Sequence, residues 1–176
     1  MFEVWPNIPR GAEQPQLQVT YRAQLDRESC WAAAAQMVLQ VVAKKVLGYD
    51  MQAGLVTAHS KHGAKCFESA LKAHGVSSRY VQAALGFVDV EMSIGAGSPL
   101  VYDLDFEEPT THVGVIAGHG KEGNGTEWIY ILDPYDLVFR SRGSSPCGWI
   151  KFAELSHRQV KPARRWCGTY YDFKKE

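Results

Sequence analysis

Residues 24–42 read QLDRESCWAAAAQMVLQVV, and this stretch decides how the fold of the chain is interpreted. Its apolar side chains recur at helical spacing and define one buried stripe: Trp31, Ala34, Ala35, Val38, Leu39 and Val42. The spacing predicts a central helix over residues 29–45, capped by Asp26 or Ser29 and ended by Gly48. The small alanines leave room for another element to pack closely against this helix.

Cys30 stands in the first turn of the predicted helix. A thiol at this position feels the helix dipole and the unpaired backbone N–H groups, and both favour the thiolate form. Most free cysteines are instead small buried hydrophobic residues, so Cys30 alone does not decide between a nucleophile and a core residue.

Gln24 lies six residues before Cys30. A side-chain amide there would place a donor beside the backbone N–H of Cys30, and such a pair stabilises the oxyanion that forms when a thiolate attacks a carbonyl. The alternative for Gln24 is a solvated loop residue.

Regular structure is predicted through most of the remaining chain. Two shorter helices are expected, at residues 64–74, with Gly75 as the stop, and at 85–94. Alternating or short apolar runs then predict strands at residues 99–106, 112–117, 128–132, 137–140 and 166–173.

The order of these elements indicates the fold class. Helices come first and antiparallel strands follow, with residues 118–125 as a hairpin loop, which indicates an α+β protein. The chain shows no internal repeat and no interdomain linker. We therefore expect a single domain over residues 1–176, with an N-terminal arm and helical lobe over about 1–95 and a β lobe over about 96–176.

His112 and Asp133 are the candidates for the rest of a nucleophilic site. His112 begins one predicted strand and Asp133 follows another, so pairing of the two strands would bring these ends together. Asp133 would then hold the imidazole tautomer while His112 takes the proton from Cys30. The alternative for Asp133 is ordinary turn chemistry, because Asp before Pro134 is common in turns.

Composition excludes several classes of protein. The chain has 176 residues, of which 45% are hydrophobic, 11% aromatic and 22% charged, the balance of a folded globular protein. Its 19 basic and 19 acidic residues cancel, so we expect no nucleic-acid partner. No apolar run approaches the roughly 20 residues that span a bilayer, and residues 1–6 lack the pattern of a Sec signal peptide.

Cysteine and histidine spacing indicates neither a disulfide scaffold nor a metal centre. The four cysteines are too few and too scattered for a disulfide framework, although pairing of Cys147 with Cys167 stays open. His59, His62 and Cys66 do not follow a standard zinc-ligand spacing. We expect no metal site.

Several short blocks of the chain resemble a known family. Gln24 with Ser29-Cys30-Trp31 resembles the nucleophile segment of papain-like cysteine peptidases, both in the Gln-to-Cys spacing and in the Trp that follows. Residues 97–102, 111–118 and 129–135 resemble a bacterial branch, the bacteriocin-processing peptidases and the avirulence-type effector peptidases of plant pathogens. In that branch an Asp before Pro orients the histidine.

The resemblance implies a papain-like fold. The N-terminal helical lobe would carry the nucleophile on its central helix, and the C-terminal lobe would be an antiparallel sheet or half-barrel. Cys30 would be the nucleophile, His112 the general base and then acid, Asp133 the orienting residue and Gln24 the oxyanion donor. The chain would act as a monomer on a protein or peptide held in the cleft between the lobes, without metal or organic cofactor.

The resemblance also implies a place of action and leaves alternatives open. We expect a bacterial effector, made in the bacterial cytoplasm and exported by a dedicated secretion system into a target cell, where an activating host factor would be one more partner. Deamidation, transglutamination and peptidoglycan amide cleavage use the same kind of triad. A peptide-binding module that keeps the fold without catalysis is the alternative outside the enzymes.

Overall fold

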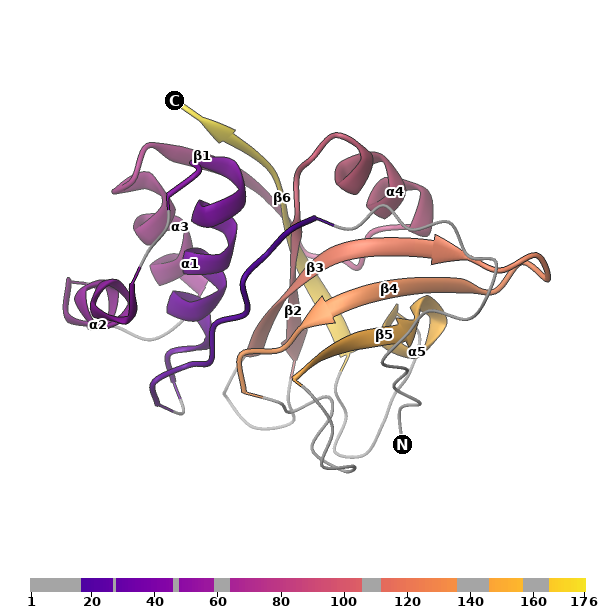
Figure 1. Ribbon diagram of the computed structural model, residues 1–176, viewed down its shortest axis with the longest axis horizontal. Coiled ribbons are helices and arrows are strands. Elements are labelled where there is room, and N and C mark those ends of the chain that lie inside the picture. Colours follow the sequence, from indigo (N-terminus) through magenta and orange to yellow (C-terminus); the bar gives the residue numbers. More distant parts are fainter. Residues whose placement is uncertain are drawn as a thin grey trace.

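A six-stranded sheet divides the helices of this protein into two groups (Figure 1). The computed structural model describes residues 17–26, 28–45, 48–58, 64–105, 112–135, 146–156 and 165–176. The helices in these ranges are α1 (Cys30–Val42), α2 (Tyr49–Ala58), α3 (Ala64–Lys72), α4 (Phe87–Gly95) and α5 (Phe152–Ser156). The strands are β1 (Val76–Val81), β2 (Leu100–Asp105), β3 (His112–Lys121), β4 (Glu127–Leu132), β5 (Cys147–Lys151) and β6 (Arg165–Lys175).

The strands follow the order β1-β6-β2-β3-β4-β5, and every neighbouring pair is antiparallel. The C-terminal strand β6, yellow in Figure 1, therefore lies inside the sheet between β1 and β2. This arrangement of helices on an antiparallel sheet confirms the α+β class predicted from the sequence.

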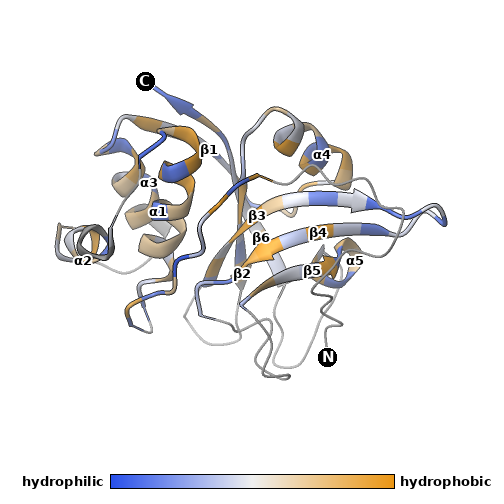
Figure 2. Cartoon of the chain, in the orientation of Figure 1, coloured by the Kyte–Doolittle hydropathy of each residue, from blue (hydrophilic) through white to orange (hydrophobic). Residues whose placement is uncertain are grey.

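Each face of the sheet carries its own hydrophobic core. α1 and α3 pack on one face, against side chains that include Val113, Val115 and Tyr170. α4 and α5 cover the other face, against side chains that include Ile116 and Ile131. Because successive side chains of a strand point to opposite faces, the alternating residues of one strand serve both cores. Figure 2 shows apolar residues along the covered parts of the strands and hydrophilic residues at the β3–β4 turn.

α1 is the central helix that the apolar spacing predicts. Its four alanines at 32–35 are completely buried, and their small side chains allow α1 to lie close to the sheet. Ser29 is the N-cap residue, as one of the two predicted alternatives. The helix ends at Val42 and not at Lys45, because Lys44 adopts a φ of 54° in the left-handed region, where a right-handed helix cannot continue. Gly48 consequently lies beyond the helix and does not end it.

The two shorter predicted helices are also present. In α3, Phe67 and Leu71 are completely buried, as their spacing predicts. Gly75 has a φ of 69°, a conformation that favours glycine, and it follows the end of this helix. α4 begins two residues later than predicted, where the Gly86 N–H donates to the Asp89 carboxylate at 3.1 Å.

β2, β3, β4 and β6 occupy four of the predicted strand positions. β3 and β4 form the predicted hairpin, but β3 continues to Lys121, so the turn is shorter than the expected loop over 118–125. The N–H of Glu122 donates to the Thr126 carbonyl at 2.9 Å and closes this turn. The strand predicted at 137–140 lies outside the described residues.

Four elements are not predicted by the sequence pattern: α2, α5, β1 and β5. β1 has the polar sequence VSSRYV and becomes a strand by pairing with β6, which lies far away in the sequence. α2 contains Gly54 and Thr57, which are weak helix formers, and α5 has only 5 residues. β1 and α4 both fall within the predicted helical lobe, yet β1 is an edge strand and α4 lies on the opposite face from α1.

The segment before α1 is extended and is attached to both halves of the molecule. Leu17 N–H donates to the Ala117 carbonyl of β3 at 2.7 Å, and Thr20 N–H donates to the side chain of Gln40 in α1 at 3.2 Å. Figure 1 shows this segment in indigo, passing beside α1. Among the helices that the structure describes, none is long and apolar enough to cross a membrane.

Candidate active site

Cys30 is positioned by the tight turn that leads into α1. The Asp26 N–H donates to Ser29 Oγ at 3.0 Å, and the Glu28 N–H donates to Asp26 Oδ1 at 2.9 Å. Cys30 is then the first helical residue, where an α-helix leaves its backbone N–H groups without an intrahelical partner. Its side chain is buried. The thiol therefore lies at the positive end of the α1 dipole and next to unused backbone donors.

His112 and Asp133 lie side by side at the ends of two paired strands. His112 begins β3, Asp133 follows β4, and the Val115–Leu132 pairing of these strands brings the two ends together. Nε2 of His112 and Oδ1 of Asp133 are 2.7 Å apart, and both side chains are buried.

The Cys30 side chain hydrogen-bonds to the same imidazole. Because Asp133 occupies Nε2, Nδ1 is the ring nitrogen left for the thiol. The structure thus brings together three of the residues that the sequence singles out, from α1, from β3 and from the turn after β4.

The electrostatics of this cluster favour a protonated imidazole. Burial by itself lowers the pKa of His112, but the charge and hydrogen bond of Asp133, together with those of Cys30, outweigh it and raise the pKa from 6.5 to about 10. His112 is therefore an imidazolium at neutral pH. The imidazolium therefore places a positive charge beside the Cys30 side chain.

The turn that carries Asp133 is held from three directions. The Asp133 N–H donates to the Pro146 carbonyl at 2.9 Å, and the Tyr135 N–H donates to Asp133 Oδ1 at 3.0 Å. The Tyr21 hydroxyl, from the extended segment, bonds to the carbonyls of Asp133 and Pro134 at 3.2 and 3.3 Å. These contacts fix the carboxylate, so its orientation toward His112 does not depend on the imidazole alone.

Gln24 lies beside this turn, through its backbone. Its N–H donates to the Pro134 carbonyl at 3.0 Å, and its side-chain Nε2 donates to the Asp26 carbonyl. One of the two amide hydrogens on Nε2 is thus used within the turn before α1, and the other is left for a ligand. Oε1 of Gln24 is buried without a hydrogen-bond partner among the described residues.

Tyr102 is a neighbour of the site that the sequence pattern does not single out. Its Cα lies opposite Gly114 in the β2–β3 ladder, so its side chain shares a sheet face with Gly114 and His112. The Tyr102 side chain is completely buried. Burial, and then the nearby charges of Asp133, Cys147 and Cys30, raise its pKa well above 10, so this tyrosine stays neutral at physiological pH.

Sequence reasoning misses Tyr21 and Tyr102, and also Gln52 of α2, whose side chain hydrogen-bonds to the backbone on both sides of Gln24. No motif or spacing in the sequence marks these tyrosine and glutamine side chains as neighbours of the site. The glycine two residues after His112 is the one available signal, because it permits a large side chain from the next strand to cross β3.

Within the described ranges, the structure contains no metal centre formed by the other candidate ligands. Among the residues that the structure describes, no group of three or more His, Cys, Asp or Glu side chains could hold a metal ion, and His59 and His62 lie outside that part of the chain.

The four cysteines are free thiols. Cys147 lies on β5 and Cys167 on β6, with β2, β3 and β4 between them. At ~4.8 Å per strand their separation is ~19 Å, which is too long for a disulfide. The pairing left open by the sequence does not occur.

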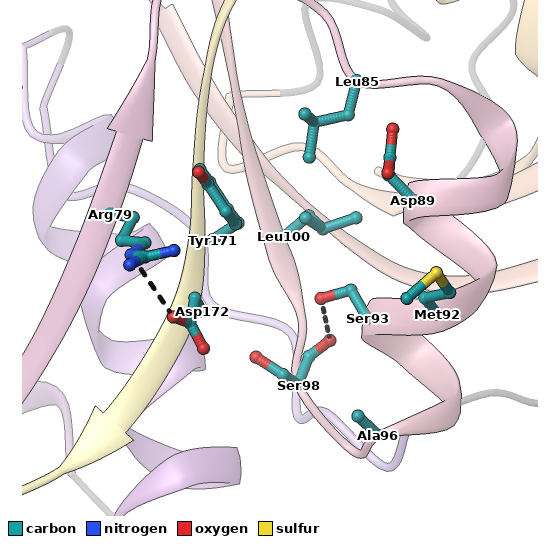
Figure 3. Close-up of a pocket in the computed structure, with 10 residues that line it drawn as sticks. All are labelled: Arg79, Leu85, Asp89, Met92, Ser93, Ala96, Ser98, Leu100, Tyr171 and Asp172. Carbon is teal, nitrogen blue, oxygen red and sulfur yellow. Dashed lines mark hydrogen bonds and ion pairs between the residues drawn. The ribbon is translucent and has the colours of Figure 1, made fainter.

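A cavity of about 390 Å³ lies between α4 and the β1–β6 edge of the sheet. Figure 3 shows Asp89 and Met92 of α4 on one side of it and Tyr171 and Asp172 of β6 on the other. The Asp172 carboxylate is 3.6 Å from Arg79 Nε, so it is already paired. None of the four predicted site residues lines this cavity, and we assign it no role.

Solved structures show the same fold. The peptidase domain of Streptococcus ComA, a bi-functional ABC transporter involved in quorum sensing, is 15% identical, covers 88% of this chain and 98% of its own, and has a TM-score of 0.57. A double glycine motif protease from an AMS/PCAT transporter, in complex with the leader peptide, is 16% identical and has a TM-score of 0.54. The match covers 92% of this chain and 94% of the protease chain. Bromelain from Ananas comosus is 13% identical and has a TM-score of 0.51. The match covers 90% of this chain and 94% of the bromelain chain.

Fold and site together define a protein with the papain-like cysteine peptidase fold. More specifically, the chain belongs to the Peptidase_C39 like family, whose model matches residues 16–155. A comparison with curated proteins found no match. The papain-like fold and the bacteriocin-processing branch suggested by the sequence blocks are thereby confirmed.

Proposed function

We propose that this protein is a cysteine peptidase, in which Cys30, His112 and Asp133 hydrolyse an amide bond of a protein or peptide. The observation that carries the proposal is the buried imidazole of His112, hydrogen-bonded to the Asp133 carboxylate at 2.7 Å on one side and to Cys30 on the other. A nucleophile, a base and an orienting carboxylate in this order are the parts that thiol-dependent acyl transfer requires.

The first half of the proposed reaction forms an acyl-enzyme. The Cys30 thiolate attacks the carbonyl carbon, and the negative charge moves to the carbonyl oxygen. The backbone N–H of Cys30 and the Gln24 amide stabilise that oxyanion. When the tetrahedral species collapses, the C–N bond breaks and the His112 imidazolium gives its proton to the leaving amine.

The second half releases the acid and restores the site. Neutral His112 takes a proton from water, and the resulting hydroxide attacks the thioester. The C–S bond then breaks, which frees the carboxylic acid and returns Cys30 to the thiolate and His112 to the imidazolium. The raised pKa of His112, about 10, supports this cycle because it keeps the proton on the imidazole until the amine leaves.

Alkylation kinetics test the activated pair without a known substrate. The rate of Cys30 alkylation by a limiting electrophile is measured against pH by peptide mass spectrometry. Cys66, Cys147 and Cys167 serve as internal controls in the same molecule. We expect Cys30 to react fastest, and to keep reacting well below the ordinary thiol pKa of about 8.5.

The His112→Ala variant is the matched comparison. It should remove the reactivity of Cys30 at low pH and leave the three other thiols unchanged. Alkylation of Cys30 no faster than that of its three neighbours would contradict the peptidase proposal and favour a peptide-binding module with this fold.

The reaction class is tested on protein substrates. We expect new peptide termini after incubation with candidate proteins. Ammonia release without backbone cleavage would instead indicate deamidation or transglutamination, and lysis of purified sacculi would indicate a peptidoglycan amidase. Loss of each activity in Cys30→Ser identifies it as this protein's own.

We also propose that the protein is a bacterial effector exported by a dedicated secretion system into a target cell. The resemblance of residues 97–102, 111–118 and 129–135 to the bacterial branch that includes the avirulence-type effector peptidases supports this proposal. A secretion-reporter fusion of the full chain should give signal inside target cells, and retention of the fusion in the producing cell would contradict it. Adding target-cell extract to the Cys30 alkylation assay tests for an activating host factor.

A further inference from the structure

Gln52 of α2 binds the backbone on both sides of Gln24. Its side-chain Oε1 accepts from the Leu25 N–H at 2.8 Å, and its Nε2 donates to the Ala23 carbonyl at 3.0 Å. One amide group thus holds the residues immediately before and after Gln24, in the way that a neighbouring strand would. The Gln52 side chain is completely buried, so solvent does not compete for these bonds.

A second buried glutamine sets the orientation of Gln52. Nε2 of Gln52 also donates to Gln36 Oε1 at 3.2 Å, and Gln36 Nε2 donates to the Gly48 carbonyl at 2.8 Å. Gln36 lies on α1, the helix that begins with Cys30. The amide network therefore connects the helix that carries the thiol to the segment that carries Gln24.

The opposite side of Gln24 is attached to the β half of the site. Its N–H donates to the Pro134 carbonyl at 3.0 Å, next to Asp133. Gln24 is thus held between the turn after β4 and the Gln52 side chain. Neither attachment uses the Gln24 side chain, whose Nε2 donates one of its two hydrogens to the Asp26 carbonyl, so the backbone of Gln24 is fixed independently of its amide.

From these contacts we infer that Gln52 is a positioning residue for the oxyanion donor. This inference rests on the proposed function, in which Gln24 stabilises the oxyanion. A donor contributes to catalysis only when it is held within a fraction of an ångström of the developing charge. Gln52 supplies that constraint from α2, and it touches neither the substrate nor the reacting atoms.

Two electrophiles distinguish a positioning role of Gln52 at the oxyanion donor from a general effect on the reactivity of Cys30. Iodoacetamide alkylates a thiolate by direct displacement at a saturated carbon, without an oxyanion. p-Nitrophenyl acetate acylates the same thiolate through a tetrahedral oxyanion and releases nitrophenolate, which is followed by absorbance. With Cys30→Ala as background, the ratio of acylation rate to alkylation rate measures oxyanion stabilisation at Cys30 alone.

Gln52→Met keeps the length of the side chain and removes its hydrogen bonds. We expect this variant to lower the acylation rate ~10-fold and to leave the alkylation rate unchanged. Gln24→Ala should lower the acylation rate by at least as much, because removing one oxyanion donor costs ~100-fold or more in a well-ordered site. Gln52→Glu keeps the acceptor for the Leu25 N–H and should give an intermediate ratio. Gln40→Met is the matched control, because Gln40 holds the same segment farther away, at Thr20.

A double variant tests whether Gln52 acts through Gln24. In the Gln24→Ala background, Gln52→Met should have no further effect on the ratio. Equal losses of acylation and alkylation in Gln52→Met, or in Gln52→Glu if the Met variant does not fold, would overturn the inference and leave Gln52 a structural residue. Wild-type Cys30 that reacts with neither reagent faster than the other thiols would instead overturn the proposed function itself.

Discussion

The hydroxyl of Tyr102 lies directly over Gly114, two residues along β3 from His112. A Cβ atom added at Gly114 would lie 2.2 Å from Tyr102 Oη and 2.3 Å from Cζ. Such contacts are far shorter than van der Waals distance, so only glycine permits the Tyr102 ring to cross β3 here. The ring is completely buried and cannot move aside into solvent. The packing beside His112 therefore depends on the absence of a side chain at Gly114.

Gly114→Ala should destabilise the protein by about 3 kcal/mol, the upper range for overpacking a core, and should slow Cys30 alkylation through displacement of His112. Urea unfolding gives the free energy and mass spectrometry gives the rate. Gly123→Ala is the control, since a Cβ there meets nothing within 4 Å. Adding Tyr102→Leu to Gly114→Ala removes the clashing ring atoms and should recover part of the loss. No recovery would show that another contact makes glycine necessary.

Asp133→Asn should lower the pKa of His112. The variant removes the charge that raises this pKa, while burial, which lowers it, remains. With less imidazolium beside Cys30, we expect its alkylation at about pH 6 to slow by ~10-fold or more. Asp89→Asn, on α4 and outside the site, should leave the rate unchanged. A pH–rate profile that is the same for wild type and Asp133→Asn would exclude Asp133 as the source of the raised pKa.

Protein stability should fall as the site loses its proton. The pKa of His112 is raised from 6.5 to about 10 on folding, so its contribution is fully present below about pH 6.5 and is lost as the pH rises through about 10. We expect the free energy of unfolding of the wild type to decrease over this window relative to His112→Gln. Urea unfolding at several pH values measures both. A constant difference between the two proteins would contradict the raised pKa.

Cys147 and Cys167 should both remain free thiols, even after mild oxidation of the dilute folded protein. Cys147 and Cys167 are separated by three strands, which prevents an intramolecular disulfide. Thiol counting in denaturant with an aromatic disulfide reagent, under non-reducing conditions, measures this. A disulfide between Cys147 and Cys167, identified in the monomer by peptide mass spectrometry, would mean that β5 and β6 are not separated by three strands.

The sequence pattern was sufficient for those elements that carry a recognisable apolar pattern. α1, α3 and α4 each have apolar residues at helical spacing, and β2, β3 and β4 have short apolar runs. β1 could not be predicted, because its polar residues become a strand only when β6 supplies hydrogen-bond partners. The same applies to α2, whose composition is a weak helix signal and whose Gln52 finds its partners in the segment before α1.

The residues of the candidate site could be predicted from the sequence, but the neighbouring side chains that pack around them could not. Cys30, His112 and Asp133 could be proposed because a helix start, a strand start and a strand end are recognisable in the sequence. Gln24 could be singled out only by its spacing from Cys30. Tyr102 could not, because its place beside the site follows from its pairing opposite Gly114.

The sequence by itself determined the helix that begins at Cys30, the apolar alternation of the central strands and the positions of His112 and Asp133 at strand ends. Local backbone preference and hydrophobic spacing are sufficient for these features. Only the tertiary structure decided that β6 lies between β1 and β2 and that Gln52 holds the backbone around Gln24. Those contacts join residues far apart in the chain, and strand pairing and the burial of polar groups select them when the chain packs.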